Sequence, residues 1–73
     1  MKFTVKLRDA NSVKDFVKIT SQYREDLSLV HGRYVVDAKS ILGIFSMDLS
    51  RPLDLVSDHT NDGLKEDLQA YVV

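Results

Sequence analysis

The stretch that decides the fold is Asp37-Ala38-Lys39-Ser40-Ile41-Leu42-Gly43-Ile44-Phe45-Ser46-Met47-Asp48-Leu49-Ser50. Its centre predicts a short helix that begins after Ser40, because a serine hydroxyl can accept the free backbone N–H groups of a first turn. On such a helix Ile41, Leu42 and Phe45 share one side, and Ile44 points away from them. A two-turn helix on a small domain buries one stripe, so one of these two groups is expected on the surface, unless the helix lies in a groove. The pattern alone leaves both arrangements open.

The composition predicts one small domain spanning residues 1–73 and argues against several classes of protein. Ten basic and eleven acidic residues leave a net charge of −1, without the basic stripe of a nucleic-acid surface. The chain has no cysteine, which excludes disulfides and thiolate metal sites. No apolar run is long enough to span a bilayer, and the first residues lack the apolar centre of a signal peptide. We therefore expect a cytoplasmic protein that binds neither nucleic acid nor membrane.

The first 30 residues show a strand, a helix and a second strand. Strict alternation of apolar and polar residues predicts a strand over residues 2–7. Ser12 is predicted to cap a helix that runs to about Gln22, with Asp15 as the second member of a weak capping box. Residues 27–30 are predicted to form the second strand.

The remaining elements follow in the order strand, short helix, strand, helix. A tight turn at His31-Gly32 is predicted to join the second strand to a third over residues 33–37. A fourth strand is expected over residues 53–57, and Thr60 or Asn61 is expected to cap a last helix. The apolar stripe of that helix is predicted to be Leu64, Leu68, Tyr71 and Val72. The order β-α-β-β-α-β-α predicts an α+β fold, with a four-stranded, mostly antiparallel sheet and the helices on one face.

A resemblance to the HPr family, the phosphocarriers of the bacterial sugar phosphotransferase system, is carried by Lys39-Ser40-Ile41-Leu42-Gly43-Ile44-Phe45-Ser46-Met47. That family reads Lys-Ser-Ile-Met-Gly-Val-Met-Ser-Leu at its regulatory serine, and a weaker similarity extends over most of the chain. The resemblance implies the HPr-like open-faced sandwich, with three helices on one face of the sheet. It also implies that Ile41, Leu42 and Phe45, with Leu49, are exposed positions that dock protein partners. Asp48 stands where the family typically has glycine, so a left-handed turn is expected there.

The similarity to the family fails at the residue that carries the family's chemistry. HPr proteins carry phosphate on a histidine in a Gly-Leu-His-Ala-Arg-Pro type loop, and the corresponding stretch here, Leu7-Arg8-Asp9-Ala10-Asn11-Ser12, places Asp9 at that histidine. Asp9 is interpreted as a solvated carboxylate that flanks the helix, with an acyl phosphate on Asp9 as the alternative. His31 and His59 are interpreted as surface histidines. No catalytic triad, phosphate-binding loop or carboxylate pair is present, so we expect no enzymatic activity, no metal and no cofactor.

Ser40 retains both the residue type and the sequence context of the family's regulatory serine. In low-GC Gram-positive members an ATP-dependent kinase phosphorylates this serine, and the product binds a transcriptional regulator. The resemblance therefore implies phosphorylation at Ser40 and a serine kinase as one partner, whereas a capping role alone would also explain the serine. We expect a non-catalytic HPr-like regulatory or protein-binding module. A divergent phosphocarrier that uses Asp9, and a structural domain that retains only the fold, are the alternatives.

Overall fold

The sheet is the frame of the molecule, and the computed structural model describes residues 1–59 and 62–73. The described strands are β1 (Lys2–Val5), β2 (Ser28–His31), β3 (Tyr34–Asp37) and β4 (Leu53–Val56), in the spatial order β1-β4-β2-β3. Every neighbouring pair is antiparallel. The register places Phe3 opposite Leu55, Leu55 opposite Leu29, and Leu29 opposite Val36, so one apolar row crosses all four strands.

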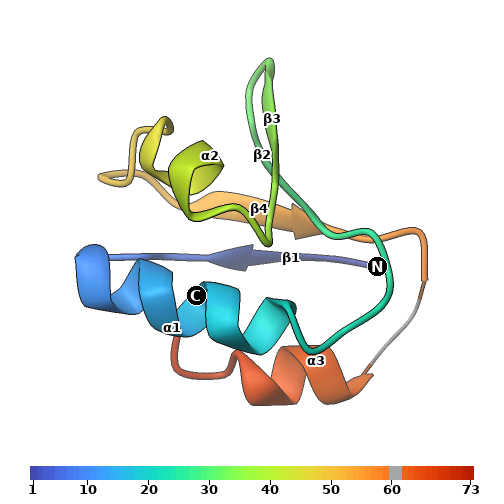
Figure 1. The fold of residues 1–73 in the computed structure, drawn as a ribbon. Coiled ribbons are helices and arrows are strands. Elements are labelled where there is room, and N and C mark those ends of the chain that lie inside the picture. Colours follow the sequence, from blue (N-terminus) through green and yellow to red (C-terminus); the bar gives the residue numbers. More distant parts are fainter. Residues whose placement is uncertain (60–61) are drawn as a thin grey trace.

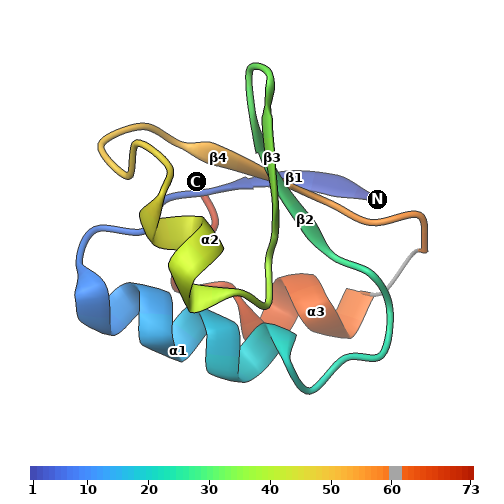
Figure 2. The ribbon, with the colours of Figure 1, turned by 45° about the horizontal axis from the view of Figure 1, so that its top comes forward.

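Three helices lie on the apolar face of this sheet, as predicted. They are α1 (Ala10–Thr20), α2 (Ile41–Phe45) and α3 (Asp62–Asp67). α1 and α3 run side by side beneath the strands, and α2 lies between α1 and the end of β3 (Figures 1 and 2). The element order β-α-β-β-α-β-α and the open-faced sandwich are therefore confirmed.

The core fills the space between the sheet and the helices. Alternate strand residues and one stripe of each helix supply it, which is the reason for the period-2 and period-3.6 patterns in the sequence. Its buried members are Phe3, Val5, Leu7, Val13, Phe16, Leu27, Leu29, Ala38, Ile44, Met47, Leu53, Leu55, Leu64 and Leu68. On the opposite face, Thr4 donates its hydroxyl to the carboxylate of Asp54 at 2.9 Å.

The predicted bounds of the first strand and helix were wrong. The strand stops at Val5, and Leu7 is buried beyond it. The helix begins at Ala10 with Asp9 as its N-cap, and Ser12 lies inside the first turn. The helix ends at Thr20, whose buried hydroxyl donates to the carbonyl of Ala38 at 2.9 Å and so joins α1 to the segment before α2.

The hairpin turn lies one residue later than predicted. The register pairs His31 with Tyr34, so the two-residue loop is Gly32-Arg33 and His31 belongs to β2. Gly32 has a φ of 59°, whereas Arg33, like every other described non-glycine residue, avoids positive φ. A positive φ at the first loop residue alone is the pattern of a type II′ turn, which matches the strand twist and favours glycine at that position.

The last helix is shorter than predicted, because Tyr71 and Val72 of its predicted apolar stripe lie beyond its end and pair with residues of the first strand and the segment after it. α3 ends at Asp67, and beyond it Val72 forms a bridge with Val5. The amide of Lys6 donates to the carbonyl of Tyr71 at 2.8 Å, and the amide of Val73 donates to the carbonyl of Thr4 at 3.0 Å. The carboxyl-terminal residues therefore cover the outer edge of β1. The predicted caps Thr60 and Asn61 lie outside the described residues.

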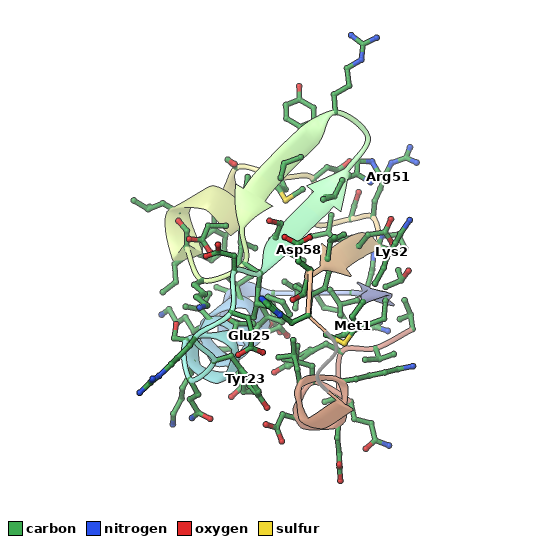
Figure 3. All side chains as sticks on the ribbon, turned by 90° about the vertical axis from the view of Figure 1, so that its right-hand side faces the viewer. Met1, Lys2, Tyr23, Glu25, Arg51 and Asp58 are labelled. Atoms are coloured by element: carbon green, nitrogen blue, oxygen red, sulfur yellow. The ribbon has the colours of Figure 1, made fainter. Side chains whose placement is uncertain are left out.

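Two hydrogen bonds outside the core hold the surrounding segments to the sheet and helices. The Met1 ammonium group donates to the carbonyl of Ser57 at 2.7 Å, at the end of β4 (Figure 3). Tyr23, which follows α1, donates its hydroxyl to the carboxylate of Asp67 in α3. This carboxylate raises the pKa of Tyr23 to about 12, because the neutral phenol is the hydrogen-bond donor.

Candidate partner-binding site

The helix α2 is defined locally by the residues on either side of it. Ser40 is its N-cap, as predicted, and the Ser40 hydroxyl accepts the backbone N–H of Gly43 at 3.0 Å. At the other end Ser46 donates its hydroxyl to the carbonyl of Gly43 at 2.5 Å. A Cβ on Gly43 would lie 3.2 Å from Ser40 Oγ, so the small residue allows this close approach. The short helix is thus held by its own caps.

The apolar residues of α2 divide between the core and the surface. Ile44 is fully buried, whereas Ile41, Leu42 and Phe45 are 39%, 84% and 41% exposed. The helical pattern had left open which group would face solvent, whereas the resemblance had implied that these three residues would, and the structure places them outward. We call Ile41, Leu42 and Phe45 the α2 patch. Leu49, the fourth predicted docking residue, is half-buried and packs against the core, so it borders the patch rather than projecting from it.

Asp9 has a structural role at the start of α1. Its carboxylate accepts the backbone N–H of Ser12 at 2.7 Å, which is the bond of an N-cap. Hydrogen bonds from the backbone and side chain of Ser12 hold the pKa of Asp9 below its ordinary value of 3.8. Asp9 is exposed, and the negative charge of its carboxylate contributes to raising the pKa of Tyr71. Asp9 is therefore the exposed N-cap of α1, a role that the sequence pattern had predicted for Ser12.

A notch of mixed polar and apolar lining next to α2 was not predicted from the sequence. It has a volume of about 370 Å³ and lies between the tip of the β2–β3 hairpin and the end of α2. Its lining residues are His31, Tyr34, Ser46, Met47 and Asp48. No local pattern could reveal it, because two segments some 15 residues apart form its walls.

Asp48 does not adopt the left-handed turn that was expected at its position. No described residue other than Gly32 has a positive φ. Asp48 instead accepts the backbone N–H of Ser50 at 3.0 Å and the hydroxyl of Ser50 at 2.6 Å. These bonds, and then electrostatic interactions with Arg51 and His31, lower the pKa of the Asp48 carboxyl. An Asx turn, in which the Asp48 side chain accepts from residue 50, therefore forms in place of the expected left-handed turn and requires no strained backbone.

The part of the chain that the structure describes offers neither a cluster of metal ligands nor a membrane-spanning helix. Within residues 1–59 and 62–73, no group of three histidine or acidic side chains is placed to hold a metal ion. None of the helices described there has both the length and the apolar character needed to cross a bilayer.

Comparison with known proteins identifies the fold. No protein-family model matches the chain, and no curated protein matches it in sequence. Among solved structures it is similar to the protein described as "HPr-C-His" from Thermoanaerobacter tengcongensis, with a TM-score of 0.79 and 20% sequence identity. The superposition covers 96% of this chain and 88% of that one. The protein therefore has the HPr-like α+β fold, which the pattern of elements and the segment around Ser40 had indicated.

Proposed function

We propose that this protein is an HPr-like protein-binding module, which docks a protein partner through the α2 patch and is switched by phosphorylation of Ser40. The observation that carries the proposal is the division of α2 between its buried Ile44 and its exposed Ile41, Leu42 and Phe45. A cluster of exposed large apolar side chains on a small protein usually binds a partner. An apolar groove on the partner would complement this convex patch.

The role of Asp9 supports a binding module over a phosphocarrier. A phosphocarrier needs a nucleophile with its reacting atom free, together with donors for the phosphoryl oxygens. One oxygen of the Asp9 carboxylate accepts from Ser12, as expected of a helix cap, and its pKa is lowered by hydrogen bonds from Ser12 and not by a neighbouring cation that could hold a phosphoryl group. The chain's two histidines lie in β2 and after β4, away from the start of α1.

The position of Ser40 supports its use as a switch. Its hydroxyl lies at the start of α2, directly before Ile41, so a phosphoryl group would add about −1.5 to −2 charges beside the patch. The ammonium group of Lys39, next to Ser40 in the chain, is engaged with the carbonyl of Tyr23 at 2.5 Å. A phosphate on Ser40 would therefore remain available to a basic residue of the partner, and we expect phosphorylation to strengthen binding of such a partner.

The first experiment measures intact mass after two incubations. One uses phosphoenolpyruvate with the general phosphotransferase enzyme, and the other uses ATP with the HPr serine kinase. We expect no phosphate from the first and one phosphate at Ser40 from the second, with Ser40→Ala as the blank. A phosphate acquired in the first incubation would overturn the proposal in favour of a phosphocarrier, and Asp9→Asn would then test the acceptor. Absence of phosphate in both would remove the switch.

The second experiment tests the patch by titrating the protein with the HPr serine kinase and with the HPr-binding transcriptional regulator. Leu42→Arg is expected to weaken binding at least tenfold, because a central apolar contact is typically worth more than 1 kcal/mol. Val73→Arg is the matched control, since it places the same charge on another exposed apolar residue, 65% exposed and outside α2. Equal affinity of Leu42→Arg and wild type for both proteins would contradict docking of these partners at the patch.

Ser40→Asp isolates the effect of charge from that of capping. Aspartate is as good an N-cap as serine, whereas Ser40→Ala loses about 1 kcal/mol of capping stability. Tighter binding of Ser40→Asp to the regulator, with unchanged stability, would support the switch.

A further inference from the structure

The two edges of the sheet differ in what covers them. The outer edge of β1 is bridged by Val72 and Val73. The outer edge of β3 has no neighbouring strand within the described residues, and it exposes Tyr34 and Val35 by 72% and 62%. The β2–β3 hairpin also projects beyond the other elements (Figures 1 and 2). Exposed apolar residues on a free edge strand are a template for pairing with another strand.

The backbone of β3 restricts how a new strand can pair. The amide of Ala38 donates to the carbonyl of Leu27 at 2.9 Å, so residue 38 directs its backbone groups toward the β2 side. In an antiparallel ladder this direction alternates, so Val35 and Asp37 of β3 direct their N–H and C=O groups away from β2, and Arg33 lies in the turn directly before the strand. The Asp37 carbonyl accepts the amide of Ser40 at 3.0 Å and keeps its second lone pair. A partner strand must match its own outward residues to Val35 and Asp37.

We propose that the β3 edge binds the β3 edge of a second copy of this chain, antiparallel, about a two-fold axis at Val35. This register pairs Val35 with Val35 of the second copy, and Arg33 with Asp37 of the second copy, twice. Val35 and Asp37 direct their backbone groups outward, so strand pairing centred on Val35 also brings the charge of Asp37 toward Arg33 of the second copy. Arg33 and Asp37 are both exposed and of opposite charge, and Asp37 is on the same face as Val35. One oxygen of the Asp37 carboxylate accepts the backbone N–H of Lys39 at 2.9 Å, which leaves the other oxygen for Arg33 of the second copy.

Charge also favours this register over the neighbouring register centred on Val36, which likewise pairs outward-facing backbone groups with one another. Moving the axis by one residue, to Val36, would pair Val35 with Asp37 and place Arg33 opposite Lys39 of the second copy. That arrangement sets two cations against each other and leaves the carboxylate opposite a valine. In the proposed register Tyr34 lies across from Val36 of the second copy, an aromatic and β-branched pair of the kind that stabilises antiparallel sheets. The sequence of β3 is thus complementary to itself.

Association is expected to be weak, because each copy contributes only four strand residues. The test is sedimentation equilibrium of the whole chain up to about 1 mM, where weak dimers are populated. We expect the weight-average mass of the wild type to rise toward twice that of one chain. A wild type that stays monomeric at that concentration would overturn the proposal and leave the edge to a foreign extended segment.

A charge-exchange experiment tests the register itself. Arg33→Glu alone sets Glu against Asp37, and Asp37→Lys alone sets Lys against Arg33, so each variant by itself is expected to be monomeric. In a 1:1 mixture both cross pairs have opposite charges, and the dimer is expected to return. Lys14→Glu, the same change of charge on the exposed face of α1, is the control and should associate as the wild type does. A mixture no heavier than its components, or an Arg33→Glu variant that dimerises alone, would overturn the proposal.

Discussion

At the scale of single residues, α1 and α2 each begin with a side-chain N-cap, and both capping residues are predicted site residues. Asp9 caps α1 through the amide of Ser12, and Ser40 caps α2 through the amide of Gly43. Both positions attract functional interpretation because the sequence resemblance to HPr proteins aligns them with that family's phosphate sites. A cap leaves a hydroxyl or carboxylate at the surface with a defined orientation, and Ser40 combines that orientation with the α2 patch beside it.

The capping role of Asp9 predicts a specific dependence of stability on pH. Because hydrogen bonding lowers the pKa of Asp9 below 3.8 in the folded state, its contribution to stability is present above the unfolded pKa and is lost as pH falls through the folded one. Asn at this position is a neutral cap of similar quality. We therefore expect wild type to lose more stability than Asp9→Asn between about pH 6 and pH 2. Urea unfolding at a series of pH values measures this, and parallel profiles would contradict it.

At the scale of elements, α2 shows how five residues can serve the core and the surface together. Ile44 is the only residue of this helix that is fully buried, and it lies one position before the exposed Phe45. A helix of this length is not stable alone, so its position depends on Ile44 in the core and on the cap at Ser40. The patch is therefore presented by a helix that the core holds in place.

This division predicts opposite results from two truncations in one helix. Ile44→Ala should cost about 2–4 kcal/mol, because it leaves a cavity in the core. Leu42→Ala should change stability by less than about 0.5 kcal/mol, since that side chain is 84% exposed. Chemical denaturation of both variants measures the difference. A Leu42→Ala variant as unstable as Ile44→Ala would show that the patch is part of the folded core.

At the scale of the whole molecule, Tyr71 connects three parts that lie far apart in the sequence. Its ring meets Phe16 of α1 edge-on, with centroids 6.3 Å apart, and its hydroxyl donates to Asp15. Its carbonyl accepts the amide of Lys6 beyond β1. The segment that covers the β1 edge is thereby fastened to the helical layer.

Two substitutions separate these contacts of Tyr71. Tyr71→Phe removes only the hydroxyl bond and should cost about 1 kcal/mol at neutral pH. Tyr71→Ala removes the ring as well and should cost about 2–4 kcal/mol. The Asp15 carboxylate raises the pKa of Tyr71 from 10.0 to about 12, so the hydroxyl contributes below about pH 10 and its contribution is lost as pH rises through 12. Unfolding at neutral and alkaline pH should show the gap between wild type and Tyr71→Phe closing, and a constant gap would contradict this.

Prediction from sequence succeeded where the determinant is local or periodic. The order of elements, the Ser40 cap and the opposite sides of Ile44 and Ile41 follow from hydrogen-bonding side chains and from helix and strand periods. The predicted start of α1 was wrong because two nearby residues could each serve as its N-cap. Asp9 and Ser12 are both good caps, and the structure uses the first.

The sequence by itself determined the alternation of strands and helices, the position of α2 and the absence of a histidine before α1, because each is a property of neighbouring residues. Only the tertiary structure decided that Ile41, Leu42 and Phe45 are exposed, that Val72 pairs with Val5, and that His31 and Asp48 share a notch. These features depend on which surfaces meet when the helices pack on the sheet. Contacts between residues distant in the chain leave no periodic mark in its sequence.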